Sequence, residues 1–244
     1  MNNILIKWNA LLKGIILWMR PHVVFGFLSG GFKFISNLLY LSSWISKQDR
    51  KGILNDFFTT VRDHNKRETL YLYVAEKCEL KQKNFLYLEF GVYKGSSFRW
   101  WMNYNNNPHS AFFGFDTFEG LPEDWGIFFD KGTFATAIPE MNDSRGKFVK
   151  GLFQDTLPTF ISQQNLHDPR MKIIHMDADL FSSTIYTLSL LSPYLKKGDL
   201  ILFDEFNVPN HEFAAFKIIT DSFYLKTKLI GAVNNYYQIA LEVL

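Results

Sequence analysis

Four short apolar runs, each followed by a glycine or an acidic residue, are the feature that most limits how this chain can fold. The runs are Phe85–Phe90, Ala111–Phe115, Lys172–Met176 and Leu200–Phe203. Short apolar runs bounded by turn residues are typical of strands buried on both faces of a sheet. Helical patterns separate the runs along the chain. This alternation predicts an α/β fold with a mostly parallel sheet and helices on both faces.

Three further strands complete the prediction. One covers Phe148–Phe153, and two final strands, Thr227–Val233 and Tyr236–Val243, flank the hairpin signal Asn234-Asn235. We therefore expect a Rossmann-like, seven-stranded sheet that ends in a C-terminal antiparallel hairpin. Helices are predicted over 96–102, 184–195 and 211–223, and in two pieces between Gly52 and Leu80.

Length and composition bound the domain organisation. A chain of 244 residues with 47% hydrophobic residues can form one large α/β domain with an appendage. We place the boundary at the charged stretch Lys47–Lys51, which gives an N-terminal helical extension over 1–50 and a main domain over 51–244. A net charge of +2 without a dense basic run argues against nucleic acid as a partner. The single cysteine, Cys78, excludes an intrachain disulfide and suits the reducing cytoplasm.

Residues 1–46 are apolar and aromatic, but Lys13, Arg20 and Lys33 interrupt them. No uncharged stretch approaches the roughly 20 residues that a membrane-spanning helix needs. Two interpretations stay open for this segment: packing on the core or across a homodimer, and peripheral contact with a membrane surface such as the inner face. We expect a homodimer, because a monomer would leave a large apolar patch in water.

A glycine turn follows the first predicted strand, with Gly91 and Gly95 four residues apart. Such glycines let the backbone turn tightly and present helix N-terminal N–H groups to a ligand, although many are purely structural. The spacing is not that of the dinucleotide-binding motif, which disfavours a nicotinamide-dependent oxidoreductase. Asp116 ends the second strand, where an acidic residue would bind a ribose diol or cap the next helix.

Four acidic residues follow two strands that we expect to be adjacent: Asp177, Asp179, Asp204 and Glu205. Carboxylates gathered in this way repel one another unless a cation compensates them. Asp177 and Asp179 share one face of an extended chain, so both can point into one cavity. Oxygen ligands of this kind suit Mg²⁺. The alternative is a set of helix caps and solvated acids.

Four motifs in this order carry a resemblance to a known family: Glu89–Gly95, Phe115–Pro122, Asp177–Thr184 and Asp204–Phe206. Together they resemble the class I S-adenosylmethionine methyltransferases. They look closest to the macrocin O-methyltransferase family, whose members methylate sugar hydroxyls on natural products. The resemblance runs from about Phe85 to Phe216.

The resemblance implies a binding site for S-adenosylmethionine. Gly91 and Gly95 would line its methionine part, and Glu89 and Ser97 would hold the amino and carboxylate groups. Asp116 would bind the ribose hydroxyls, and Gln154 would meet the adenine amino group. The full set implied to bind the cofactor is Glu89, Gly91, Tyr93, Gly95, Ser97, Asp116, Gln154 and Asp177.

The resemblance also implies a metal site and a general base. In the macrocin family the metal, expected here to be Mg²⁺, is held by acids that match Asp179, Asp204 and Glu205. Glu205 departs from the family's usual Asp, which shifts that ligand by one methylene. Asp179 is the first candidate base and His211 the second, although His211 also fits a solvated position at a helix start. Leu180 stands where catechol-type enzymes place Lys, which argues against a catechol acceptor.

The expected activity is transfer of a methyl group from S-adenosylmethionine to a sugar hydroxyl with the help of a divalent metal. The long stretch Leu121–Arg145, rich in aromatic side chains, would either stack on the acceptor or cover the cofactor. The alternatives are a metal-independent methyltransferase of a phenol, carboxylate or amine, and a non-catalytic protein that binds S-adenosylmethionine.

Overall fold

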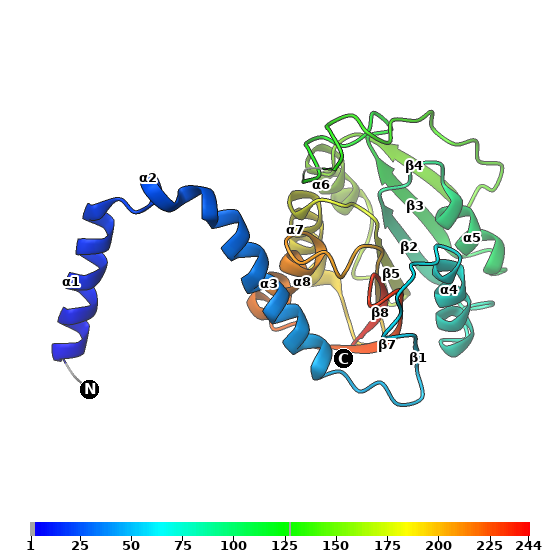
Figure 1. Ribbon diagram of the computed structural model, residues 1–244. Coiled ribbons are helices and arrows are strands. Elements are labelled where there is room, and N and C mark those ends of the chain that lie inside the picture. Colours follow the sequence, from blue (N-terminus) through cyan, green and yellow to red (C-terminus); the bar gives the residue numbers. More distant parts are fainter. Residues whose placement is uncertain (1–2, 127) are drawn as a thin grey trace.

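A mixed sheet of eight strands organises the computed structural model, which describes residues 3–126 and 128–244 (Figure 1). The strand order is β1-β7-β8-β6-β5-β2-β3-β4, and β8 alone runs against its neighbours. The strands are β1 (Leu54–Asn55), β2 (Phe85–Phe90), β3 (Ala111–Asp116), β4 (Gly146–Lys150), β5 (Met171–Met176), β6 (Leu200–Phe203), β7 (Thr227–Val233) and β8 (Gln238–Val243). The predicted Rossmann-like class and closing antiparallel hairpin are confirmed, and the two-residue β1 adds an eighth strand at one edge.

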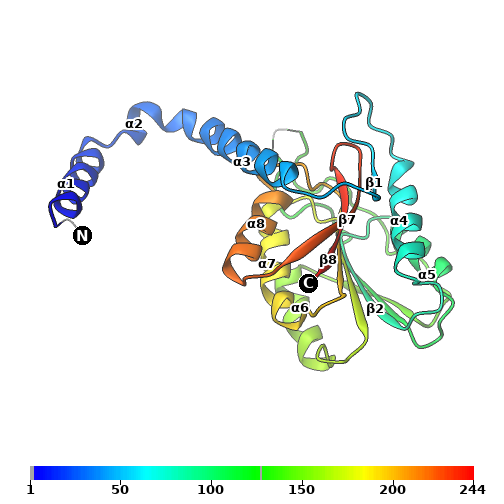
Figure 2. The ribbon, with the colours of Figure 1, turned by 90° about the horizontal axis from the view of Figure 1, so that it is seen from below.

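Helices cover both faces of the sheet, as Figure 2 shows. On one face lie α4 (Lys66–Lys77) and α5 (Ser96–Tyr104), and on the other lie α6 (Phe153–Gln163), α7 (Phe181–Leu191) and α8 (Glu212–Ser222). A short 3₁₀ turn, η2 (Ser192–Tyr194), follows α7. The six residues of β2 are all buried and alternate between the two helical layers. This central strand therefore joins both halves of the core.

Two predicted elements differ from the structure. The third strand was expected over Phe148–Phe153, but β4 ends at Lys150 and Phe153 begins α6. Gly151, with φ +142°, breaks the strand, and the ring of Phe153 packs against Phe90 at 5.3 Å between centroids. Phe153 therefore buries its ring in the core from a helix instead of from a strand.

The first of the two helical pieces expected between Gly52 and Leu80 is also wrong, because β1 and an irregular loop occupy it. Polar contacts with the β7–β8 turn hold this segment. The Asn55 side chain donates to Tyr236 Oη at 3.0 Å, and the Asn234 N–H donates to Asp56 at 3.1 Å. Tertiary contacts with a distant turn thus replace local helical hydrogen bonds.

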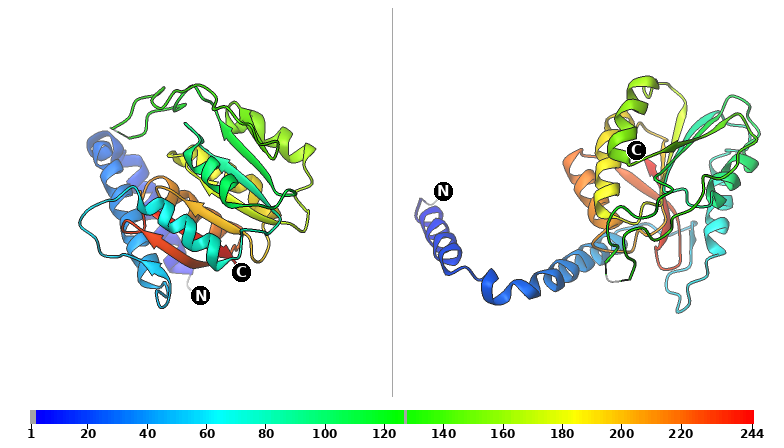
Figure 3. Two further views of the ribbon diagram at one scale, coloured as in Figure 1. Left: turned by 90° about the vertical axis from the view of Figure 1, so that its right-hand side faces the viewer. Right: turned by 90° about the horizontal axis from the view of Figure 1, so that it is seen from above.

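An N-terminal arm, residues 3–46, extends away from the domain (Figures 1 and 3). It consists of α1 (Asn3–Met19), α2 (His22–Phe25), η1 (Gly26–Leu28) and α3 (Ser29–Ser46). Only the second half of α3 packs closely on the domain, through buried Leu41 and through Trp44, whose ring lies 4.9 Å from Phe206. Among the described residues, His22–Ser46 is the one helical stretch with the length and composition to cross a membrane.

Candidate active site

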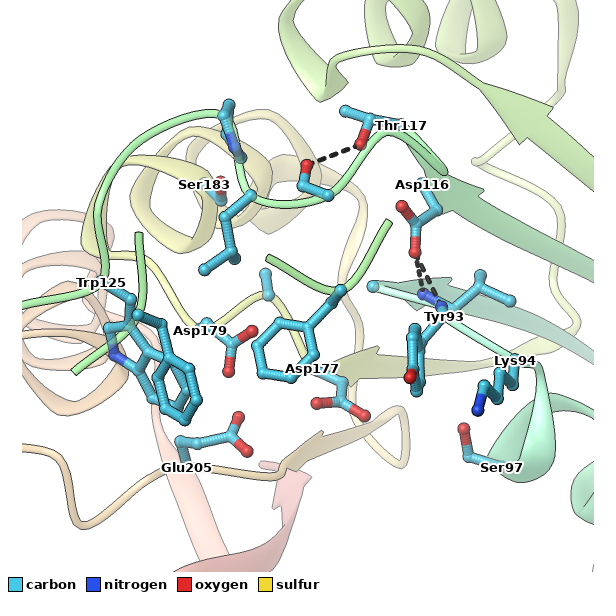
Figure 4. Close-up of a pocket in the computed structure, with 18 of the residues that line it drawn as sticks. Tyr93, Lys94, Ser97, Asp116, Thr117, Trp125, Asp177, Asp179, Ser183 and Glu205 are labelled. Carbon is cyan, nitrogen blue, oxygen red and sulfur yellow. Dashed lines mark hydrogen bonds between the residues drawn. The ribbon is translucent and has the colours of Figure 1, made fainter. Parts of the chain in front are cut away.

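A cavity of about 440 Å³ opens at the carboxyl ends of the parallel strands β2, β3, β5 and β6 (Figure 4). Its size falls in the range of about 300–1,000 Å³ that small-molecule sites occupy, and its place is the one expected for ligands of open α/β sheets. Trp125 and Phe129, from the long loop after β3, form part of its wall. The predicted site residues that line it are Gly91, Tyr93, Ser97, Asp116, Gln154, Asp177, Asp179 and Glu205.

The turn after β2 requires glycine at position 91. Gly91 has φ +93°, and a Cβ atom built on it would lie 1.7 Å from the carbonyl oxygen of Asp177. Its N–H donates to the carbonyl of Phe115 at 2.9 Å, and the Asp177 N–H donates to the carbonyl of Phe90 at 2.9 Å. Gly91 therefore lets three strand ends meet closely at the cavity. Gly95, also with positive φ, is the N-cap residue of α5 and does not line the cavity.

Asp116 anchors the glycine turn. Its Oδ2 accepts hydrogen bonds from the N–H groups of Val92 and Tyr93, both at 2.8 Å (Figure 4). Its Oδ1 accepts one from the N–H of Phe118 at 2.8 Å. A carboxylate has about four lone-pair sites, so capacity for a ligand is left. Asp116 lines the cavity as well as holding the backbone around it.

Glu89 lies behind the cavity. It is fully buried, it does not line the cavity, and both of its oxygens are engaged. Ser97 Oγ donates to Oε1 at 2.7 Å, and Tyr87 Oη donates to Oε2 at 2.5 Å. In this structure Glu89 holds Ser97, which does face the cavity, whereas direct contact with the cofactor was expected.

Tyr87 and His175 extend this buried network, and sequence analysis missed both. His175 Nδ1 lies 2.6 Å from Tyr87 Oη, and His175 Nε2 lies 3.2 Å from Tyr71 Oη. The signal available in the sequence was strand alternation, because Tyr87 and Glu89 share one face of β2. The network satisfies several buried polar atoms at once, which fixes the back wall of the cavity.

The acids after β5 and β6 form the opposite wall. Carboxylate oxygens of Asp177, Asp179 and Glu205 all lie within 4.8 Å of one another, and the three side chains point toward a common space (Figure 4). Burial and the neighbouring Asp177 raise the pKa of Asp179 to about 8, and burial raises the pKa of Glu205 well above its ordinary value. Oε2 of Glu205 accepts no hydrogen bond within the described part of the chain.

The predicted metal trio is not one group in the structure. Asp204 is fully buried and clusters with His175 and Asp177, whereas Asp179 and Glu205 cluster with Asp177. An all-oxygen set with an unpartnered buried carboxylate oxygen fits a hard divalent cation. The residues that fit best are Asp177, Asp179 and Glu205.

Arg67, from α4, supplies a positive charge to these acids and was not predicted. Its guanidinium forms an ion pair with Asp204, and its Nη2 lies 3.4 Å from Oδ2 of Asp177. Arg67 stands three and four residues before the buried Leu70 and Tyr71, which places it on the inward face of α4. A cation at that helical position was the signal that the sequence carried.

His211, the second candidate base, does not line the cavity. It is the N-cap residue of α8, and its ring lies 6.5 Å from the ring of Trp125. Burial and the nearby Lys33 lower its pKa, which favours the neutral imidazole. His211 therefore lies outside the cavity, next to Trp125, which forms part of the cavity wall.

Comparisons with known proteins agree with this geometry. The family described as "Methyltransferase domain" matches residues 88–206. Over 112 residues the chain is 26% identical to an 8-demethyl-8-(2,3-dimethoxy-alpha-L-rhamnosyl)-tetracenomycin-C 4'-O-methyltransferase of Streptomyces olivaceus. That match covers 38% of this chain and 41% of the relative, so it spans about two fifths of the relative's length.

Solved structures share the fold. The calicheamicin methyltransferase CalS11 superimposes with a TM-score of 0.59 at 20% identity, over 85% of this chain and 91% of that one. The O-methyltransferase NovP gives a TM-score of 0.53 at 20% identity, over 72% of this chain and 78% of that one. Residues 88–206 match a methyltransferase domain. The shared fold, the glycine turn, Asp116 and the acids at the strand ends are consistent with a class I enzyme that uses S-adenosylmethionine.

Proposed function

We propose that this protein transfers the methyl group of S-adenosylmethionine to a hydroxyl group of a sugar or glycosylated metabolite. The observation that carries the proposal is a single cavity with the glycine turn on one wall and three carboxylates on the other. A methyl donor on the glycine side would face a group able to accept a proton. The named relatives support the acceptor class: one is described as a 4'-O-methyltransferase of a rhamnosyl tetracenomycin, and CalS11 as a TDP-rhamnose 3'-O-methyltransferase.

The reaction places simple demands on the chain. The bond between sulfur and the methyl carbon breaks as the acceptor oxygen attacks in line, and the hydroxyl proton must leave. Asp179 lines the cavity, and burial raises its pKa to about 8, which makes its ionised carboxylate a stronger base than that of an ordinary aspartate. The ionised form of Asp179 would take that proton. Holding the two reactants in line at about 3–3.5 Å supplies much of the rate enhancement.

Asp177, Asp179 and Glu205 would hold a divalent ion such as Mg²⁺, and the closeness of their oxygens supports this part of the proposal. When bound, such an ion lowers the pKa of a coordinated hydroxyl and fixes its position. The ring of Trp125 stacks on that of Phe129 at 5.1 Å between centroids, beside the same cavity. These rings offer an apolar surface against which a sugar ring can lie.

A second candidate is a metal-independent methyltransferase of another small acceptor. The observation that favours it is Arg67, which already gives Asp177 and Asp204 a counter-charge. A chelator distinguishes the two candidates, because it abolishes methyl transfer only in the metal-dependent case.

Calorimetric titration of S-adenosylmethionine, with and without Mg²⁺, tests the cofactor. We expect micromolar binding that Asp116→Ala abolishes and that Asp155→Ala, a change at an exposed acid on α6, leaves intact. Labelled methyl transfer to TDP-rhamnose, compared with catechol, then tests the acceptor class. Absence of cofactor binding in both conditions would contradict the proposal.

A further inference from the structure

The N-terminal arm presents apolar side chains to solvent along most of its length. Between residues 4 and 40 every residue is exposed except Gly26 and Asn37, which are partly buried. Trp18 and Phe27 are 83% and 81% exposed. Soluble proteins rarely leave a contiguous apolar surface of this size in water, so this arm requires something to cover it.

The side chains of α1 are sorted by chemistry around the helix. At about 100° per residue, Trp8, Leu12 and Met19 fall on one broad apolar face. Lys7 and Lys13 fall on the opposite half of the helix. A wide apolar face with tryptophan, opposite a cationic face, is the arrangement of helices that lie in a membrane interface.

The charge of the arm distinguishes between the partners that could cover its apolar surface. Residues 1–46 contain four Lys or Arg residues and no Asp or Glu. A second copy of the arm would bring like charges together, whereas anionic lipid headgroups offer the opposite charge. The charge pattern therefore favours an anionic bilayer over self-association.

The outer face of α3 continues the apolar surface of the arm. Its inner side is fixed to the domain, where the Asn37 side chain donates to Asn210 Oδ1 at 2.9 Å. On the other side Phe32, Ile35 and Leu39, at helical spacing, are exposed. Lys13 lies just past the middle of α1 and Lys33 lies near the middle of the helical stretch His22–Ser46, and lysine at the centre of a bilayer is costly. A position along the surface suits these helices better than a position across the membrane.

We propose that residues 3–40 dock on the surface of a bilayer containing anionic lipids and hold the cavity beside that surface. The root of the arm lies near the acidic wall, since Lys33 Nζ is 5.5 Å from the ring centre of Phe181, two residues after Asp179. Docking depends on the arm alone and does not require the proposed methyl transfer.

Vesicle flotation of the full-length protein tests the proposal. We expect flotation with vesicles containing phosphatidylglycerol and little with pure phosphatidylcholine. The double variant Lys7→Glu/Lys13→Glu should reduce partitioning onto the anionic vesicles at least about tenfold. The matched control Lys226→Glu/Lys228→Glu changes the same charge at two exposed positions beside β7 and should float like the parent protein. Trp8→Ser/Trp18→Ser should also weaken flotation, through loss of apolar contact.

Several outcomes would overturn the proposal. Absence of flotation, together with a dimer in light scattering, would assign the arm to a second copy of the chain. Equal partitioning onto neutral vesicles, or an unchanged Lys7→Glu/Lys13→Glu variant, would remove the role of anionic lipid. Circular dichroism and cofactor binding check that each variant is folded. Should the charge variant fail to fold, salt titration of the parent protein tests the same point, since salt weakens binding to anionic lipid.

Discussion

The two walls of the cavity differ in how completely the chain satisfies them. On the glycine wall Asp116 accepts three backbone hydrogen bonds, and both oxygens of Glu89 have donors. On the acidic wall Glu205 keeps a buried oxygen without a partner, and Arg67 is the one cation that forms ion pairs with Asp177 and Asp204 in the described part of the chain. The first wall is prebuilt from protein atoms. The acids of the second wall have fewer partners, so a proton or a bound cation would stabilise them.

Gly91→Ala should have the largest effect, because it changes the glycine wall at the point where the ends of three strands meet. A methyl group 1.7 Å from a backbone carbonyl oxygen cannot be accommodated without separating β2 from β5. We expect no cofactor binding and little folded protein, measured by calorimetry and thermal melting. Gly198→Ala is the matched control, since Gly198 has φ +89° with open space around it. It should cost only about 1–2 kcal/mol. Similar melting of the two variants would contradict this account.

Arg67→Met should come next, because it removes a counter-charge from the acidic wall. Breaking a buried ion pair typically costs about 3–5 kcal/mol, and Asp204 would keep a buried charge without its partner. If this wall binds a divalent cation, Mg²⁺ should stabilise the variant more than it stabilises the parent protein. Arg62→Met is the control, because Arg62 lines the same cavity but stacks on Tyr237, 3.5 Å from the ring centre. Melting temperatures with and without Mg²⁺ measure the difference, and an equal Mg²⁺ effect in both variants would count against a metal on this wall.

Tyr87→Phe removes a hydrogen-bond partner from the glycine wall, as Arg67→Met removes an ion-pair partner from the acidic wall. It deprives Glu89 Oε2 of its donor and His175 Nδ1 of its neighbour, and an unsatisfied buried polar atom costs about 1–3 kcal/mol. In a domain of this size that is a fall in Tm of about 2–4 °C per kcal/mol. The loss should be the same with and without Mg²⁺. Tyr186→Phe, which removes one long hydrogen bond to the carbonyl of Gln154, should have little effect. A Mg²⁺-dependent loss in Tyr87→Phe would show that the walls are coupled.

The sequence predicted the parts of this site that depend on local pattern. Phe85–Phe90 is a strand because a mostly apolar run, with Glu89 as its one charged residue, suits a central position, and Gly91 ends it because only glycine fits there. The meeting of Asp177 with Glu205 follows from the pairing of two adjacent parallel strands. Each of these features is fixed by a few consecutive residues and the rules of parallel sheets.

The features that sequence analysis missed depend on contacts between distant segments. Arg67 contacts Asp177, which lies 110 positions later in the chain. No local sequence pattern predicts that the helix of Arg67 covers the acidic wall. The segment around Asn55 loses its expected helix to a turn 181 residues away, through Tyr236. The contact of Glu89 with the cofactor stays a prediction. Its hydrogen bonds with Tyr87 and Ser97 could not be predicted, because family motifs give residue types and not the direction of a side chain.

Per pH unit, the dependence of stability on pH is the smallest of these expected effects, and it separates the two walls directly. Without metal, Asp179 has a pKa of about 8 in the folded protein, raised by burial and by Asp177 from an ordinary value of 3.8. Between these values the folded state holds a proton that the unfolded state has released, so stability falls as pH rises from about 4 to 8 and levels off above. One proton gives a slope of at most about 1.4 kcal/mol per pH unit. Asp179→Asn should flatten that slope, and Mg²⁺ should flatten it in the parent protein, because a cation favours the ionised carboxylate. Melting temperatures across this range measure the effect. A slope that Asp179→Asn leaves unchanged would assign the proton to another group and weaken the choice of Asp179 as base.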